Sequence, residues 1–187
     1  MTQNPRQPGR PRESIDATVF AATLRTIAES GYNRATVDRI AATAGVAKTT
    51  VYRRWASRGE LITAAVVDSF GAMPLTGDDF DELLGQGIRW LARKIADPGL
   101  GAALAGLFAD AVNDAELREI LAADLQGPYL KALTAKLGRP ERKVRLMMDA
   151  CVGTLLQRMG ITGEPMAEED VAELAGMVAG MLGRPER

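Results

Sequence analysis

The chain has 187 residues, of which 47% are hydrophobic and 25% are charged, and its formal net charge is −1. This composition is typical of a globular protein and excludes a disordered or collagen-like chain. There is no histidine, and Cys151 is the one cysteine, which excludes His-dependent catalysis, imidazole zinc sites and an intrachain disulfide. We therefore expect neither a metal site nor a cofactor.

The charge is unevenly distributed along the chain. Residues 1–60 carry ten Lys and Arg against five Asp and Glu, whereas residues 61–187 carry thirteen against nineteen. This asymmetry predicts a basic module for a polyanion joined to an acidic module. The uncharged stretch 98–109 has only 12 residues, while a membrane span needs roughly 20, and the polar N-terminus lacks the apolar core of a signal peptide. We expect a cytoplasmic protein without a membrane partner.

Four short helices are predicted in the first third of the chain. Apolar residues at helical spacing mark a helix over 15–30, with Gly31 as its stop. A second helix follows Thr36 and ends before Gly45, and a third runs from Ala47 to about Trp55. Ser57 then has the character of an N-cap for a fourth helix.

Five further helical segments follow a glycine- and proline-containing linker over 71–79. The spacing predicts helices over about 83–95, 100–112, 115–137, 140–159 and 166–182, with a bend in the third of these near Gly127-Pro128. No alternating strand pattern occurs, so the predicted fold is all-α with about nine helices. We divide it into a basic arm (1–12), a three-helix N-terminal domain (13–58) and a C-terminal helical domain (59–187).

The most informative stretch is TVDRIAATAGVAKTTVYRRW, residues 36–55. It has two short helices joined at Gly45, with apolar residues where the helices would cross, and this is the pattern of a helix-turn-helix. The second helix exposes side chains that can all donate hydrogen bonds to phosphates and base edges in a major groove: Lys48, Thr49, Thr50, Tyr52, Arg53 and Arg54. A solvated basic hairpin within a helical bundle is the alternative.

Residues 10–66 resemble the DNA-binding domain of TetR-family transcriptional regulators. The matching positions are Gly31-Tyr32, Thr36-Val37, Ile40-Ala41, Ala44-Gly45-Val46, Thr50, Tyr52 and Leu61. The resemblance implies a homodimeric repressor whose C-terminal domain binds a small molecule. It also implies that Thr36 and Arg58 contact phosphate and that Lys48, Thr49, Thr50 and Tyr52 face the operator. Ala47 departs from the family, which often has a Ser or Thr N-cap there.

The arm before the first helix contains arginines among prolines. Gly9-Arg10-Pro11 is similar to an AT-hook, so Arg10 and Arg12 are candidates for minor-groove contacts. A basic tail with only nonspecific affinity is the alternative.

The later helices carry apolar side chains that could line an effector site, and the resemblance places such a site among them. Methionines and aromatic rings favour an apolar ligand. The candidates are Trp90, Leu104, Phe108, Leu125, Tyr129, Met147, Met148, Cys151 and Leu155. Each could instead be an ordinary core residue, and Cys151 is better explained as a buried thiol than as a redox sensor. Arg89, Arg93 and Lys94 could anchor an anionic group or form a solvated helix face.

The last two helices are expected to dimerise, because the resemblance implies a four-helix interface. The predicted contact stripe consists of Val171, Leu174, Ala175, Val178 and Met181. Together these features predict a regulator that binds a palindromic DNA operator as a dimer and is released by a small, apolar effector. The alternative is a helical small-molecule or protein-binding module without DNA recognition. An enzyme is not expected, because the acidic cluster Asp78 to Glu82 lacks a nucleophile–base pair and is typical of a helix start.

Overall fold

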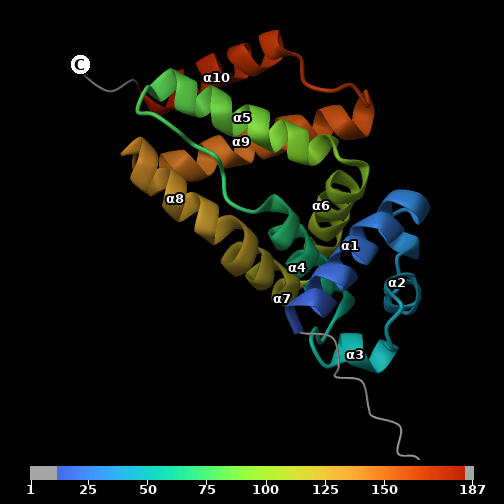
Figure 1. Cartoon of the computed structure of the whole chain (residues 1–187). Helices are drawn as coiled ribbons and strands as arrows, with labels where there is room; N and C mark the ends of the chain where they lie inside the picture. The colour runs from blue at the N-terminus through green and yellow to red at the C-terminus, as the bar shows by residue number, and fades with distance from the viewer. Residues whose placement is uncertain (1–11, 184–187) are drawn as a thin grey trace, which may run out of the picture.

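The computed structural model describes residues 12–183, with side chains from residue 15 onward. Over this part of the chain every regular element is helical (Figure 1), which confirms the all-α prediction. The elements are α1 (Arg12–Ser30), η1 (Tyr32–Arg34), α2 (Val37–Ala44), α3 (Lys48–Tyr52), α4 (Arg58–Phe70), α5 (Phe80–Ala96), α6 (Pro98–Ala111), α7 (Ala115–Ile120), η2 (Leu121–Gln126), α8 (Gly127–Leu137), α9 (Glu141–Ile161) and α10 (Glu168–Leu182).

The helical segment predicted over 115–137 is continuous in direction but not in hydrogen bonding. Residues 121–126 form a π-helical stretch, η2, between α7 and α8. At Gly127-Pro128, where the sequence predicts a bend, α8 begins directly after η2. Proline has no backbone N–H, so Pro128 cannot donate the usual helical hydrogen bond to the preceding turn. The wider π-helical turn lies directly before this missing bond.

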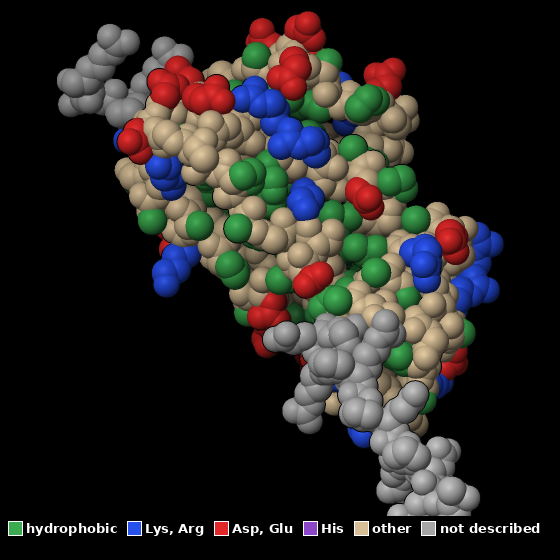
Figure 2. Space-filling view, viewed as in Figure 1, with side chains coloured by type: hydrophobic (Ala, Val, Ile, Leu, Met, Phe, Trp, Pro, Cys, Tyr) green, Lys and Arg blue, Asp and Glu red, His purple; other side chains and the backbone are tan. Residues whose placement is uncertain are grey.

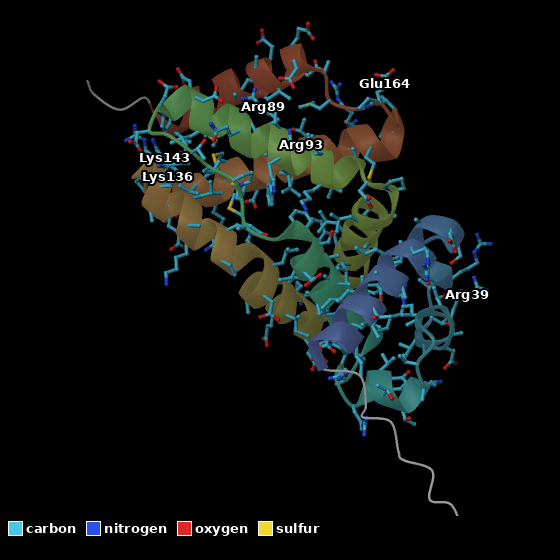
Figure 3. All side chains as sticks on the ribbon, in the orientation of Figure 1. Arg39, Arg89, Arg93, Lys136, Lys143 and Glu164 are labelled. Carbon is cyan, nitrogen blue, oxygen red and sulfur yellow. The ribbon has the colours of Figure 1, made fainter. Side chains whose placement is uncertain are left out.

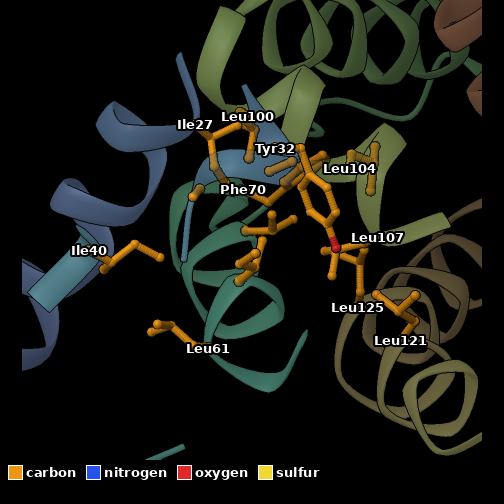
Figure 4. Packing of buried hydrophobic residues seen from close by; sticks show 14 of the residues in the cluster. Ile27, Tyr32, Ile40, Leu61, Phe70, Leu100, Leu104, Leu107, Leu121 and Leu125 are labelled. Carbon is orange, nitrogen blue, oxygen red and sulfur yellow. The ribbon is translucent and has the colours of Figure 1, made fainter. Parts of the chain in front are cut away.

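One apolar core joins the first four helices to α6 and α7. Ile27, Ile40 and Leu61 are fully buried, and each comes from a different N-terminal helix. Leu100, Leu104 and Leu107 of α6 enter the same cluster (Figure 4), which continues to Leu121 and Leu125 of η2. The N-terminal helices are therefore packed directly on the rest of the chain. The predicted domain boundary after residue 58 lies in the first turn of α4, whose later turns belong to this core.

Two glycines of α6 allow α1 and η1 to approach this helix closely. A Cβ at Gly99 would meet the backbone carbonyl of Leu24, and a Cβ at Gly106 would overlap the ring of Tyr32. Asp97 ends α5 and also begins α6, where its carboxylate accepts the N–H of Leu100 at 2.8 Å. The predicted break at residues 97–99 is thus a corner between α5 and α6, and α6 packs against α1.

A second core lies at the opposite end of the molecule, among α5, α8, α9 and α10 (Figure 1). Leu84 and Ile88 of α5 pack there with Val144 and Met147 of α9. On the face shown in Figure 2, acidic side chains gather along the upper edge, over α10, which has Glu168, Glu169 and Asp170 in its first turn. Across residues 12–183, no helix combines the length and apolar character needed to span a membrane.

Candidate functional site

The turn between α2 and α3 is built as the sequence predicts. Thr36 caps α2, with its hydroxyl accepting the N–H of Arg39 at 3.3 Å. Gly45 adopts φ 67°, a left-handed conformation that glycine tolerates without strain. Val46 then donates its N–H to the carbonyl of Ala41 at 3.0 Å, and Val51 of α3 is buried in the core shared with α2. Two short helices therefore cross at a fixed angle around Gly45.

Helix α3 is shorter than predicted and presents a polar face. It spans Lys48–Tyr52 and, as expected from its alanine, Ala47 provides no side-chain cap. Lys48, Thr49 and Arg53 are exposed, and Tyr52 is 47% exposed although it is aromatic. The hydrogen bond that Lys48 donates to Asp38 raises the lysine pKa, and the two groups are 2.6 Å apart. Thr50 is half-buried.

Arg54, one of the predicted DNA-contact residues, is directed toward α1 and away from the exposed face of α3. Arg54 lies 3.2 Å from the carboxylate of Asp16 on α1, and its side chain is only 21% exposed. Next to it the buried Trp55 packs on Phe20, with ring centroids 5.4 Å apart. Arg54 therefore ties α1 to the end of α3, whereas Arg53 is exposed.

Arg58 also differs from the expectation of a phosphate contact. Its Nε donates to the carbonyl of Ala35 at 3.0 Å, one terminal nitrogen donates to the carbonyl of Tyr32, and the other lies 3.4 Å from Asp110. The guanidinium also stacks over the Tyr32 ring, 4.1 Å from its centroid. Each of its three nitrogens thus has a contact within the chain, so the structure favours a structural role for Arg58, and the phosphate contact stays a prediction of the resemblance.

The same residues form a polar latch between the N-terminal helices and α6, which we define as Tyr32, Arg58 and Asp110. The Tyr32 hydroxyl donates to Asp110 at 2.7 Å. Burial raises the pKa of Tyr32, and the hydrogen bond to Asp110 raises it further. This latch could not be predicted from the sequence, because its members are far apart in the chain and no local pattern relates them. It links the last turn of α6 to η1 and α4.

A cavity of about 690 Å³ lies among α4, α5, α6, η2, α8 and α9. Eight of the nine predicted ligand residues line it: Trp90, Leu104, Phe108, Leu125, Tyr129, Met147, Met148 and Cys151. Leu155 does not line it, since this residue is buried in the core and the neighbouring Leu156 lies at the cavity wall instead. Helical periodicity predicts which side of α9 faces the interior. It does not tell whether Leu155 or Leu156, at the edge of that side, lines the cavity.

Three aromatic rings form one wall of this cavity. Phe70, Trp90 and Tyr129 pack with centroids 5.4 to 6.2 Å apart. The Tyr129 hydroxyl is used by the fold, because it donates to the carbonyl of Gly71 at 2.5 Å. Phe70 was missed by sequence analysis, since it ends α4 and is separated from the other two rings by 20 residues or more. The wall offers flat apolar surface with few polar groups.

The thiol of Cys151 is protonated at neutral pH. The residue is 5% exposed, and burial raises the pKa of its thiol to about 12. Because the thiolate is the reactive form, this environment makes the thiol inert. It supports the structural interpretation of Cys151 over the redox-sensor alternative.

The cations proposed as anchors for an anionic ligand do not line the cavity. Arg89 lies 3.1 Å from Glu82 and 3.5 Å from Glu168, and Lys94 donates to the carbonyl of Ser69. Arg89 and Arg93 project from α5 near α10 (Figure 3). Among the described lining residues Arg118 of α7 is the only Lys or Arg, and no periodic pattern in the sequence marks it.

Three of the five residues of the predicted dimer stripe are buried within the chain. Val171, Leu174 and Val178 are 2%, 6% and 3% exposed, because they pack inside one chain against α5 and α9. Ala175 and Met181 are partly buried against the same core. The stripe correctly marks the buried side of α10, but the partner of that side belongs to the same chain.

The outer sides of α9 and α10 carry a different set of small or apolar side chains. Met177 and Ile161 are 71% and 75% exposed, and Leu146 is 51% exposed. A Cβ added at any of four glycines between them would meet no atom within 4 Å: Gly153, Gly160, Gly176 and Gly180. This surface, which we call the α9–α10 face, combines exposed apolar residues with room for close approach.

Comparison with known proteins agrees with this architecture. A family model described as bacterial regulatory proteins, tetR family, matches residues 19–65, and one described as tetracyclin repressor-like, C-terminal domain, matches residues 73–178. An uncharacterized HTH-type transcriptional regulator of Mycobacterium tuberculosis is 45% identical over 80 residues, which is 41% of this chain and 38% of that protein. The DNA-binding transcriptional repressor TetR of Mycobacteroides abscessus is 43% identical over 54 residues, covering 29% of this chain and 28% of the repressor.

The alignments thus span about two fifths or less of these relatives. The crystal structure of a transcriptional regulator from Rhodococcus sp. shares the fold over most of both chains. Its TM-score is 0.68 with 23% identity, over 89% of this chain and 95% of that one. The two family models cover both the helix-turn-helix and the cavity-forming helices, and they describe regulators and not enzymes. The chain therefore belongs to the tetR family of bacterial regulatory proteins.

Proposed function

We propose that the protein is a cytoplasmic transcriptional repressor that binds a palindromic DNA operator as a homodimer and is released by a small, largely apolar effector. The observation that carries this proposal is the exposed, donor-rich face of α3 held at a fixed angle by Gly45. The Mycobacteroides abscessus relative is named a repressor, which supports repression over activation for this protein.

We propose that helix α3 enters a major groove of the operator. Lys48, Thr49, Tyr52 and Arg53 are exposed along it and carry donors for phosphates and base edges. Thr36 is exposed at the start of α2, where a helix N-terminus favours a phosphate. Arg10 lies outside the described residues, as does the side chain of Arg12, and for both the proposed role remains minor-groove binding.

The proposal predicts salt-dependent binding to an inverted repeat. Fragments near the gene of this protein would be tested by fluorescence anisotropy for a site with half-sites about 34–36 Å apart. We expect the logarithm of the affinity to fall steeply and linearly with the logarithm of salt concentration, because several phosphates are neutralised per dimer. An affinity that does not change with salt, or no affinity for any fragment of the host genome, would contradict DNA binding.

Because the Arg58 guanidinium bonds within the chain, we expect its replacement to lower the stability of the fold and not to weaken the electrostatic attraction to DNA. Arg58→Gln should lower the free energy of unfolding by about 1–3 kcal/mol, since the guanidinium hydrogen bonds to the carbonyls of Tyr32 and Ala35 are lost. The salt slope of DNA binding should not change. In contrast Arg53→Gln, at an exposed position, should reduce that slope by about 1 per subunit and leave the melting temperature unchanged. The opposite pattern would restore Arg58 as a phosphate contact.

For dimerisation we propose the α9–α10 face in place of the stripe first predicted. The second copy is the occupant we propose, because exposed apolar side chains and unobstructed glycines occur together on two helices that pack on each other. Close helix approach at glycines increases the contact area available to neighbouring side chains. A symmetric pair of such faces would give a four-helix contact.

Met177→Glu should convert the dimer into a monomer. The substitution places a charge at a position that the dimer would bury, which costs more than the contact can supply. The matched control is Ala135→Glu on the exposed side of α8. Sedimentation velocity should show a monomer for the first variant and a dimer for the second. If both remain dimeric, the interface lies elsewhere on the molecule.

The cavity is proposed as the effector site, and α6 as the element that reports its occupancy. Phe108 and Ala111 line the cavity, while Asp110 in the same turn belongs to the latch with Tyr32 and Arg58. A ligand that shifts the end of α6 must therefore displace latch atoms of the N-terminal helices. By linkage, a ligand that weakens DNA binding is itself bound less tightly by the DNA complex.

A further inference from the structure

The cavity has an apolar interior and a mouth that includes charge. Its interior wall consists of buried residues such as Trp90, Leu104 and Leu125. Its exposed lining residues mark the opening, among them Phe108, which is 38% exposed, and Val112, which is 72% exposed. Arg118 belongs to this exposed group. A ligand that fills the cavity would thus meet a guanidinium only at one end.

Arg118 is held in place through one side of its guanidinium. One terminal nitrogen donates to the carbonyl of Ala111 at 2.6 Å and to that of Val112 at 3.1 Å, at the C-terminal end of α6. No carboxylate of residues 15–183 lies within ion-pair distance of Arg118, although seven other Lys and Arg side chains there form such pairs. The charge is therefore positioned but not neutralised within the described chain.

The geometry leaves the other edge of this guanidinium for a ligand. The Nε and second terminal nitrogen form a planar pair of donors, and no bond within the described chain uses them. Two parallel N–H donors match the two oxygens of a carboxylate. Because the guanidinium is already fixed by two carbonyls, little side-chain entropy is lost when a carboxylate binds.

We propose that the effector is an amphipathic carboxylate, with an apolar body in the cavity and its carboxylate on Arg118. This inference rests on the proposed function of the cavity as an effector site and specifies its ligand class. The one acidic lining residue, Asp149 of α9, is exposed and is in no ion pair with a described residue. Arg118 is held by two backbone carbonyls. No such hydrogen bond within the described chain holds the carboxylate of Asp149, so Asp149 is less suited to select a cationic ligand.

Three amphiphiles of equal chain length test the proposal: decanoate, decanol and decyltrimethylammonium, each below its micellar concentration. Isothermal titration calorimetry on the full chain would give the affinity for each. The wild-type protein should bind decanoate at least about tenfold more tightly than decanol, because a hydrogen-bonded charge pair contributes an effect of that size. Decyltrimethylammonium should be the weakest of the three.

Variants then assign the preference to one side chain. Arg118→Gln should bind decanoate and decanol with equal affinity, while Arg118→Lys should keep part of the preference because it keeps the charge. Arg142→Gln is the matched control, since Arg142 is exposed on α9 and does not line the cavity. Its affinities should equal those of the wild type. Melting temperatures of all three variants would verify that they are folded.

The outcomes separate this inference from the proposed function. Equal wild-type affinities for decanoate and decanol would overturn the carboxylate proposal and leave an apolar effector site. The tightest binding to decyltrimethylammonium would overturn it in favour of Asp149. If a folded wild-type protein binds none of the three, the effector role of the cavity fails together with the ligand class.

Discussion

Replacing Tyr52 and Arg53 together by alanine is expected to abolish operator binding. Both side chains are exposed at the end of α3, and neither forms an ion pair with a described residue, so they are available to DNA. Each base or phosphate contact contributes about 1–3 kcal/mol. Because the proposed dimer would lose both residues twice, we expect the affinity to fall at least about a hundredfold. Fluorescence anisotropy on the operator fragment, with a nonspecific duplex alongside, would measure the loss.

The fold should survive this double substitution. Tyr52 and Arg53 are exposed, whereas Val51 and Trp55 anchor α3 to the core. Circular dichroism and sedimentation should therefore match those of the wild type. Arg142→Ala at the opposite end of the molecule is the control for lost positive charge, and it should retain operator affinity. Sequence-specific binding by the double variant would show that the recognition helix has been misplaced.

Gly106→Ala is expected to destabilise the protein by about 3 kcal/mol. Alanine is ordinarily favoured over glycine in a helix interior, but here a Cβ would overlap the ring of Tyr32. The ring is fixed by its hydrogen bond to Asp110 and by the guanidinium of Arg58, so it cannot move aside without breaking the latch. Overpacking of this kind costs about 1–3 kcal/mol, and loss of the latch would increase the cost. Chemical denaturation would measure it.

Two further variants test whether overlap with the Tyr32 ring causes the loss of stability in Gly106→Ala. Gly87 of α5 has only ordinary contacts beside it, with Met73 and Leu75, so Gly87→Ala should stabilise the protein by up to about 1 kcal/mol. In a Tyr32→Ala background, Gly106→Ala should no longer be destabilising, because the overlapping ring is absent. If the two substitutions at Gly106 and Tyr32 were instead additive, the explanation by direct contact would be wrong.

The helix-turn-helix could be predicted from the sequence because its determinants are local. Thr36, Gly45 and the apolar residues between them are within one another's reach along a short segment, so cap, turn and crossing follow from residue type and spacing. The same holds for the corner at Asp97 and for the exposed face of α3. Only the extent of α3 was overestimated, and it ends at Tyr52, three residues earlier than expected.

Sequence periodicity was less informative about what each apolar face contacts. The stripe with Val171, Leu174 and Val178 is buried, as its pattern requires, but against α5 and α9 of the same chain. A helical pattern specifies that one side is covered and is silent about which element covers it. For the same reason the cavity residues of α9 were identified as an inward face, while Leu155 and Leu156 were not distinguished.

The sequence by itself determined the all-α fold, the position of the helix-turn-helix and the apolar character of the C-terminal helices, because these depend on neighbours a few residues apart. Only the tertiary structure decided how Arg54 and Arg58 are engaged. The carboxylates beside them, Asp16 and Asp110, are far away along the chain and are brought to these guanidinium groups by folding. Whether a cation is engaged within the chain or open to a ligand is set by those long-range contacts.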